Sequence, residues 1–172
     1  PDRGERTGQA RDAVVPFPIR VASAVWPQHL ENVLGAGLGA NSPLAPARDA
    51  AGRAMAWLGP LKVISDGSLN TRTAFCHDPY PGGAGEFGTL NVPPGELFPL
   101  MARAHAADLP CAIHAIGDAA CGLALDAFAA TGAAGSLEHA QLLTWADIPR
   151  LAALGITASV QPAHLLDDRD AA

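Results

Sequence analysis

Two histidines stand close to the ends of apolar stretches that are typical of buried strands. His114 lies in AIHAIGD and His139 lies in LEHAQ, and apolar residues precede each of them. Because neighbouring parallel strands are about 5 Å apart, two imidazoles at adjacent strand ends could bind one metal ion. The alternative for each histidine is a structural or solvated role.

Lys62 is the one lysine of the chain, beside ten arginines, and it follows Leu61 in the apolar stretch LKVISD. Burial disfavours the charged ammonium group and so lowers the pKa of a lysine. A neutral amine can react with carbon dioxide to form a carbamate, an anionic oxygen ligand that can bridge two metal ions. Alternatively, Lys62 reaches solvent at the strand end or pairs with Asp66.

Other polar residues near the ends of the apolar stretches have two interpretations each. Asp66 could form a turn, or it could orient Lys62 or a substrate. Arg72 could be a solvated loop residue, or it could bind a substrate carboxylate or fix the loop. His164, in QPAH, could be a hydrogen-bond donor to substrate or a loop histidine. Glu138 would point away from His139 in a regular strand, so we expect a packing or supporting role for it.

These residues need a scaffold, and the apolar periodicity predicts one. Five strands are predicted over residues 18–25, 61–66, 110–116, 135–140 and 155–162. Helices are predicted near residues 45–58, 96–108, 119–131 and 145–154, with Thr144 and Asp147 as a capping pair for the last. A stretch rich in Gly and Pro, residues 70–95, predicts a long loop. Alternating strands and helices indicate an α/β fold with a parallel sheet.

The placement of the polar residues separates two α/β architectures, a doubly wound sheet and a (β/α)8 barrel. Asp66, His114, His139 and Gln161 each lie at or near the C-terminal end of a different predicted strand. Barrel enzymes assemble their active sites at those strand ends. No Gly-rich phosphate-binding loop follows the first predicted strand, so the nucleotide-binding form of the doubly wound sheet has no motif to support it.

Composition limits the partners and the location. The formal charge is −6 and no run of Lys and Arg occurs, which argues against nucleic acid or an anionic membrane as a partner. The three cysteines have no CxxC spacing, which favours a reducing, cytoplasmic setting. The N-terminal stretch PDRGERTGQARDA lacks the apolar core of a signal peptide, and no apolar run is long enough to span a bilayer.

Three stretches, in this order, resemble the amidohydrolase superfamily: LKVISDGSLNTRTA, AIHAIGDAA and LEHAQLLTWADIPRLAALGITASVQPAH. The resemblance is to the branch of metal-dependent hydrolases called amidohydrolase family 3, which includes enzymes similar to N-substituted formamide deformylase. It covers residues 18–168. It implies a (β/α)8 barrel with one or two divalent ions, commonly zinc, at the C-terminal ends of the strands.

The resemblance also assigns roles to individual residues. Lys62 matches the lysine of strand four that is carbamylated in binuclear members of the family. His114 and His139 match the metal ligands of strands five and six. Asp66, Arg72 and Gln161 match other motif positions, for which the resemblance implies substrate-side or structural roles. His164, the histidine of QPAH, is the fourth residue expected on the substrate side.

Some family features have no counterpart in the sequence. The superfamily has a His-x-His pair on strand one, a small β domain, and an aspartate on strand eight that is both metal ligand and general base. No HxH occurs here, and LLDDRDAA ends the chain soon after the predicted strand seven. We therefore expect residues 1–172 to be a single incomplete catalytic barrel domain covering approximately strands three to seven. Strands one, two and eight and the small domain would be missing from this internal piece.

In the intact family, a metal-activated water hydrolyses a C–N bond other than a peptide bond, in an amide, formamide or cyclic amide. The resemblance thus predicts a metal-dependent amidohydrolase that acts on a small amide-type molecule, with this chain alone weakly active or inactive. The alternative is a non-catalytic remnant of such a gene, or a metal-binding or assembly module. The open edges of a partial barrel could also pair with other copies and give a homo-oligomer.

Overall fold

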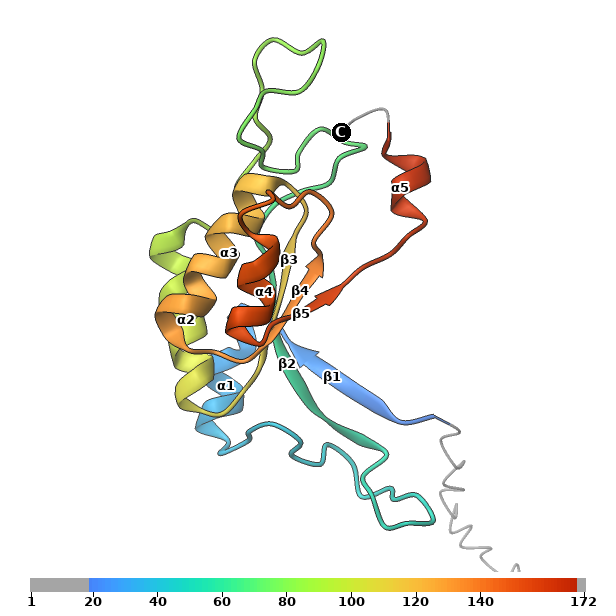
Figure 1. Cartoon of the computed structure of the whole chain (residues 1–172). Helices are drawn as coiled ribbons and strands as arrows, with labels where there is room; N and C mark the ends of the chain where they lie inside the picture. Colours follow the sequence, from blue (N-terminus) through green and yellow to red (C-terminus); the bar gives the residue numbers. More distant parts are fainter. Residues whose placement is uncertain (1–18, 170–172) are drawn as a thin grey trace, which may run out of the picture.

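The computed structural model describes residues 19–169, in which a parallel five-stranded sheet carries helices on one face (Figure 1). The order of the strands in the sheet is their order in the sequence. They are β1 (Val21–Val25), β2 (Ala56–Ile64), β3 (Cys111–Ala115), β4 (Gly135–His139) and β5 (Thr157–Ser159). The predicted α/β fold with a parallel sheet is confirmed, and the sheet is open, as expected for part of a barrel. The charged N-terminal stretch and the last three residues lie outside the described residues.

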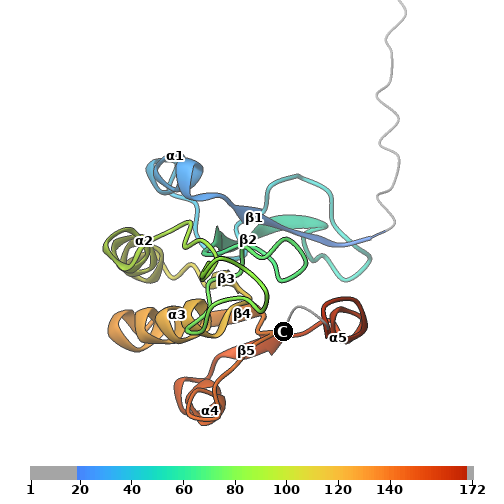
Figure 2. The ribbon, with the colours of Figure 1, turned by 90° about the horizontal axis from the view of Figure 1, so that it is seen from above.

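Helices join successive strands on the outer face of the sheet. They are η1 (Pro27–His29) with α1 (Leu30–Gly35), α2 (Pro94–Ala106), α3 (Asp118–Thr131) and α4 (Ile148–Leu154), and a short α5 (His164–Asp167) follows β5. Figure 2 shows α1 to α4 along one side of the sheet and α5 on the other side. Repeated strand and helix units of this kind are the building pattern of a (β/α)8 barrel.

The predicted helix over residues 45–58 is wrong. That stretch is a loop, and β2 already begins at Ala56. The carboxylate of Asp49 accepts hydrogen bonds from the backbone N–H groups of Ala51 and Arg53, and Gly52 has a left-handed φ of 78°. A tight turn built by an aspartate and a glycine therefore replaces the helix that the alanines favoured. The helical segment after β1 lies earlier, in η1 and α1.

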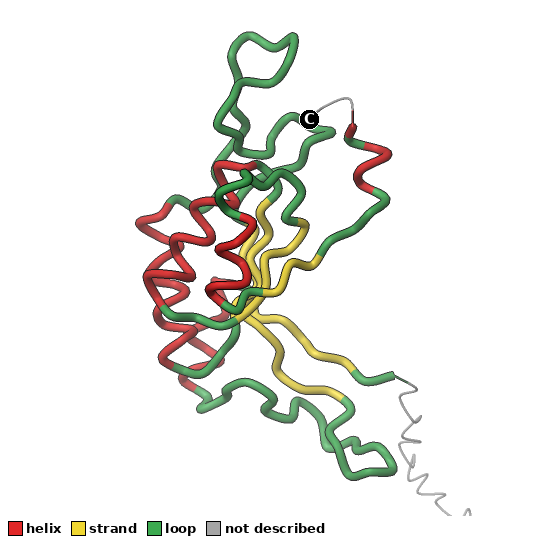
Figure 3. Tube along the Cα trace, in the orientation of Figure 1, coloured by secondary structure: helices red, strands yellow, loops and turns green. Residues whose placement is uncertain are grey.

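The other predicted elements agree with the structure in kind and differ at their ends. Pro99 lies inside α2, in its second turn. Helix α4 begins at Ile148, later than predicted, but Thr144 and Asp147 do pair: the Thr144 hydroxyl donates to the Asp147 carboxylate at 2.7 Å. The predicted long loop joins β2 to α2 and extends beyond the ends of the strands (Figure 3).

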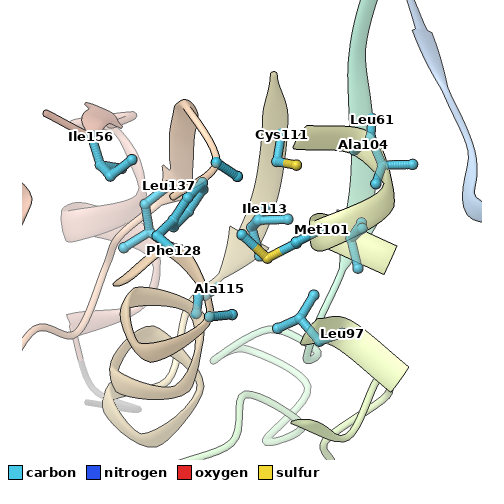
Figure 4. Packing of buried hydrophobic residues seen from close by; sticks show 14 of the residues in the cluster. Leu61, Leu97, Met101, Ala104, Cys111, Ile113, Ala115, Phe128, Leu137 and Ile156 are labelled. Carbon is cyan, nitrogen blue, oxygen red and sulfur yellow. The ribbon is translucent and has the colours of Figure 1, made fainter. Parts of the chain in front are cut away.

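The core lies between the sheet and its helices. Along the central strands, alternate residues point to the helices and are fully buried: Leu61, Val63, Cys111, Ile113, Ala115 and Leu137. Figure 4 shows Ile113 packed near Met101 of α2 and Leu137 near Phe128 of α3. Alternation along a strand places the residues between them on the opposite face. No helix among residues 19–169 is long and apolar enough to cross a membrane.

Candidate functional site

The face of the sheet opposite the helices carries three polar side chains from three neighbouring strands. Lys62 of β2 lies two residues before Ile64, which pairs with His114 of β3, and His114 in turn pairs with Glu138 of β4. Because residues two apart share a face, Lys62, His114 and Glu138 point to the same side. Helices α1 to α4 lie on the other side of the sheet, and only the short α5 is on this one.

His139 joins this group through an irregularity at the end of β4. In a regular strand it would share the buried, helix-facing side of Leu137. Instead its φ is 71°, and that of Ala140 is 44°, so both residues are in the left-handed region. The His139 ring meets the His114 ring edge to face, with 4.6 Å between ring centroids. The sequence analysis expected Glu138 and His139 to point to opposite faces, because neighbouring residues do so in a regular strand. The backbone of β4 is not regular at His139, so both side chains lie on the same face.

One nitrogen of each ring is engaged by an oxygen acceptor. The Nδ1 of His139 lies 2.7 Å from the amide oxygen of Gln161, whose amide nitrogen donates to the backbone oxygen of Ser159 at 3.3 Å. Since that oxygen can only accept, Nδ1 carries the proton and Nε2 keeps its lone pair. In His114, Nε2 donates to the backbone oxygen of Gly67 at 3.0 Å, which leaves the lone pair on Nδ1.

Asp66 contacts the ring of His114 and also holds the surrounding backbone through hydrogen bonds. Its side chain is fully buried, and one carboxylate oxygen lies 3.4 Å from Nε2 of His114. The carboxylate accepts hydrogen bonds from the backbone N–H groups of Phe75, Ile116 and Gly117 at 3.0, 3.1 and 2.9 Å. These bonds fasten the loop after β2 to the junction of β3 and α3. The arrangement makes Asp66 a positioning residue.

Lys62 has an altered pKa, and its charged neighbour is Glu138. Burial lowers the pKa of Lys62, and the negative charge of Glu138 acts in the opposite direction. Burial opposes ionisation of Glu138 too, but hydrogen bonds from Ser136 and Ser159 and the charges of Lys62 and His139 together hold its pKa below the ordinary value. One alternative for Lys62 was a pair with Asp66, but the charged group that acts on its pKa in the structure is Glu138.

A cavity of about 190 Å³ opens beside His139, between the ends of β4 and β5. Gln161 and His164 line it, and the rings of His164 and His139 are 5.6 Å apart. Arg72 is different: it is exposed on the loop after β2, with a φ of 56°, and is not among the residues that line the cavity. The structure therefore brings together every predicted site residue except Arg72.

Sequence reasoning missed Gln141 and Asp168, which also line this cavity. Gln141 follows His139 by two residues in LEHAQ, and that spacing is the signal that could have identified it. Asp168 lies in LLDDRDAA, where three aspartates stand within four residues and the sequence gives no means of choosing one of them. The structure selects it, because its carboxylate accepts from Gln141 and lies 3.6 Å from Nδ1 of His164.

The described residues offer too few side-chain ligands to complete a metal site. Among the described residues, no group of three or more His, Cys, Asp or Glu side chains could hold a metal ion. Two imidazoles with free lone pairs on His114 and His139 are present, and the third group on this face is the amine of Lys62. These groups fit a divalent ion only if Lys62 contributes an anionic oxygen.

One family model and two curated proteins match this chain. The model of the amidohydrolase family matches residues 14–172. Protein LONG AFTER FAR-RED 3 of Arabidopsis thaliana is 37% identical over 66% of this chain and 21% of its own length. The putative amidohydrolase YtcJ of Bacillus subtilis is 32% identical over 64% of this chain and 22% of its own length.

Two solved structures have the same fold over most of the chain. They are uncharacterized metal-dependent hydrolases from Pyrococcus furiosus and Pyrococcus horikoshii OT3, 30% and 33% identical, each with a TM-score of 0.77. They cover 88% and 87% of this chain, and this chain covers 30% and 29% of them. The chain thus spans about a fifth of the length of the curated relatives and under a third of the two structures.

Proposed function

The chain belongs to the amidohydrolase family, and on that premise we propose that it forms part of a metal-dependent hydrolase. The bond cleaved is a carbon–nitrogen bond outside peptides, in a small amide, formamide or cyclic amide. The observation that supports this is the meeting of the His114 and His139 rings, 4.6 Å apart, on the face that carries Lys62. Two imidazole nitrogens with free lone pairs, on adjacent strand ends, would supply two of the protein ligands that a catalytic metal ion needs.

The groups that would hold the ion are Nδ1 of His114, Nε2 of His139 and a carbamate formed on Lys62. Imidazole and anionic oxygen donors suit zinc, which is the ion we propose, as one or two ions per site. A bound divalent ion supplies an acidic water and polarises the carbonyl of the substrate. The lowered pKa of Lys62 supports carbamate formation, because the neutral amine is the form that reacts with carbon dioxide.

The other site residues prepare these groups. Gln161 fixes the tautomer of His139, and Asp66 with the Gly67 carbonyl fixes that of His114. His164 borders the cavity next to His139, where it can donate a hydrogen bond to substrate. Arg72, exposed on the loop, would contact a substrate only at the outer rim of the site. Asp66 and Gln161 thus act through the histidines.

We propose that further ligands come from strands that these 172 residues do not include, because this chain covers under a third of the two solved structures that share its fold. The chain alone would then be weakly active or inactive. A small amide-type molecule is the proposed partner, and the cytoplasm the proposed location, since Cys76, Cys111 and Cys121 are free thiols. The second candidate is a non-catalytic remnant of such a hydrolase, or a metal-binding or assembly module. The short donor set of the described residues is the observation that would favour a remnant or an assembly module.

Metal content is the test. The purified chain, incubated with zinc and bicarbonate and then desalted, should retain zinc in elemental analysis. Lys62→Ala and His139→Ala should each lose most of it, whereas His29→Ala, which removes an exposed histidine of η1, should bind as the wild type does. A folded wild-type chain without zinc, or equal zinc in all variants, would contradict the proposed metal centre.

A further inference from the structure

Residues 162–169 form a segment, here called the flap, that closes one side of the cavity beside His139. The flap consists of a turn, helix α5 and the two residues after α5, and four of its residues line the cavity. The end of β4 and the residues that follow it form the opposite wall. Figures 1 and 2 show α5 apart from the other helices. The cavity therefore lies between the end of the sheet and a separate segment.

Most of the described side chains of the flap are exposed to solvent. Leu166 is 75% exposed, and Pro162, Ala163, Asp167 and Arg169 are exposed as well. Helix α5 is four residues long, and a single helical turn is not stable by itself in water. Segments with little apolar burial open locally at a much lower free-energy cost than the core. The flap therefore needs a specific contact to stay closed.

The carboxylate of Asp168 provides that contact. Asp168 is buried, and its Oδ2 accepts a hydrogen bond from Nε2 of Gln141 at 2.7 Å. The backbone N–H of Asp168 donates to the backbone oxygen of His164 at 2.8 Å, so Asp168 is tied to α5. Gln141 is tied to the sheet, because the N–H of Leu142 donates to the backbone oxygen of Ile116 at 2.9 Å. The bond thus joins the flap to the sheet.

Opening the flap costs less than the hydrogen bond itself. Closure removes the Asp168 carboxylate from water, which is unfavourable unless other donors replace the water. The Gln141 amide is one donor, and Nδ1 of His164, 3.6 Å from the carboxylate, is a cationic partner when the ring is protonated. Arg169 also lines the cavity and has the opposite charge, but it is exposed. On opening, water returns to the carboxylate and offsets part of the lost bond.

We propose that the flap opens to admit ligand to His139, and that the hydrogen bond from Gln141 to Asp168 is the latch that holds it closed. The closed flap places the His164 ring 5.6 Å from the His139 ring, and so completes the polar side of the cavity. The open flap withdraws His164 and gives a ligand a path to His139. Closure of such segments commonly excludes water and controls ligand entry and release. The proposal depends on neither the metal nor the reaction.

Native-state hydrogen exchange of the wild-type chain is the first test. The N–H groups of Leu166 and Asp168 should exchange about tenfold or more slowly than in an unstructured peptide. Their rates should change little at low urea concentration, because local opening exposes little surface. The N–H of Ser65, which donates to the backbone oxygen of His114 at 3.0 Å in the sheet, should exchange more slowly and respond strongly to urea.

Two variants test the latch. Gln141→Met keeps the length of the side chain but removes the donor, so exchange at Leu166 and Asp168 should become about tenfold faster while Ser65 keeps its rate. Asp168→Asn keeps an oxygen that accepts from Gln141, so exchange at Leu166 should stay within about threefold of the wild type. Gln28→Met, at an exposed glutamine of η1, is the matched control.

Access to His139 is the second readout. Diethyl pyrocarbonate acylates neutral imidazoles, and peptide mass spectrometry measures the reaction of each histidine. Modification of His139 should be several-fold faster in Gln141→Met than in the wild type. His29, an exposed histidine of η1, should react equally fast in both.

Wild-type flap amides that exchange as fast as in an unstructured peptide, or as slowly as Ser65, would overturn the proposal even if Gln141→Met does not fold. Unchanged flap exchange or unchanged His139 modification in a folded Gln141→Met, or lost protection in Asp168→Asn, would also overturn it. Because no measurement uses metal or turnover, failure here is distinct from failure of the proposed zinc centre.

Discussion

At the scale of single residues, the orientation of His139 depends on one amide. The amide oxygen of Gln161 accepts a hydrogen bond from Nδ1 of His139 at 2.7 Å, and the amide nitrogen of Gln161 donates to the backbone oxygen of Ser159. Neutral imidazole has two tautomers, and without an acceptor at Nδ1 the proton can move to Nε2. Burial already lowers the pKa of His139, so the ring stays neutral to a lower pH than usual, and Gln161 decides which neutral form it takes.

Removing that acceptor should weaken zinc binding. In Gln161→Leu, Nδ1 loses its partner, and we expect the zinc affinity to fall by about 10 to 100-fold, the usual effect of losing a hydrogen bond to a metal-ligating histidine. Competition with a chromophoric chelator measures the affinity. Gln28→Leu is the matched control. An affinity unchanged in Gln161→Leu would show that the amide does not hold the ring.

The sequence predicts which residues form the site but not how they are arranged. Lys62, His114 and His139 follow from residue type and from the ends of apolar stretches. The convergence of His139 on His114 requires a left-handed backbone at two non-glycine residues, a conformation that residue types of this kind seldom signal. The hydrogen bond from Gln141 to Asp168 joins residues that are 27 positions apart, so local sequence patterns cannot reveal it.

At the scale of elements, helix α4 begins at a buried carboxylate. Asp147 accepts hydrogen bonds from the Thr144 hydroxyl at 2.7 Å and from Arg150 at 2.8 Å. Burial raises the pKa of Asp147, but these two hydrogen bonds and the charge of Arg150 outweigh it, so the pKa lies below the ordinary value. The carboxylate is therefore more stable in the folded chain than in the unfolded chain, and α4 is held in place through it.

The pH dependence of stability should follow from this carboxylate. A group whose pKa is lowered by folding stabilises above its unfolded pKa of 3.8, and that contribution is lost as the pH falls through the folded pKa. At pH 7, Asp147→Asn should lower the free energy of unfolding by about 1 to 3 kcal/mol, and the difference from wild type should shrink below pH 4 or so. Urea denaturation at pH 7 and pH 3 measures both.

Asp78→Asn, at an exposed aspartate in the loop after β2, is the matched control and should change little at either pH. A difference between wild type and Asp147→Asn that is the same at pH 3 as at pH 7 would contradict the assigned role of the charge.

The elements that sequence predicts well are the ones whose signal is local and strong. All five strands and the helices α2 and α3 overlap the stretches where they were predicted, although β2 begins five residues earlier, at Ala56. The alanines of residues 45–58 also favour a helix, but Asp49 and Gly52 form a turn there and Ala56 pairs with Val21 of β1. Pairing with a strand 35 positions away in sequence overrides local propensity.

At the scale of the whole molecule, the described sheet has two free edges, β1 and β5. Val21 donates its N–H to Met55 at 2.9 Å, so the N–H of the next residue, Ala22, points away from β2. Unpaired N–H and C=O groups along an edge invite pairing with another chain. Self-association of the 172-residue chain through these edges is the expected result.

Proline at the outward position should weaken this association. Ala22→Pro removes an N–H that makes no bond to β2, so the fold should persist while the dissociation constant of the dimer rises by about tenfold, a change of about 1.4 kcal/mol. Analytical ultracentrifugation over a concentration series measures the constant, and far-ultraviolet circular dichroism checks the fold. A wild-type chain that stays monomeric throughout, or an unchanged constant in Ala22→Pro, would contradict edge pairing.

The sequential order of the strands bears on how the chain is made. From β2 onward, each described strand pairs with the one synthesised immediately before it, and the helix between them is complete when the second strand leaves the ribosome. Among the described strands, only β1 has to wait for a partner that is translated later. Structure can therefore grow one β/α unit at a time in the direction of translation, and the rings of His114 and His139 come together as soon as the unit that ends in β4 has formed.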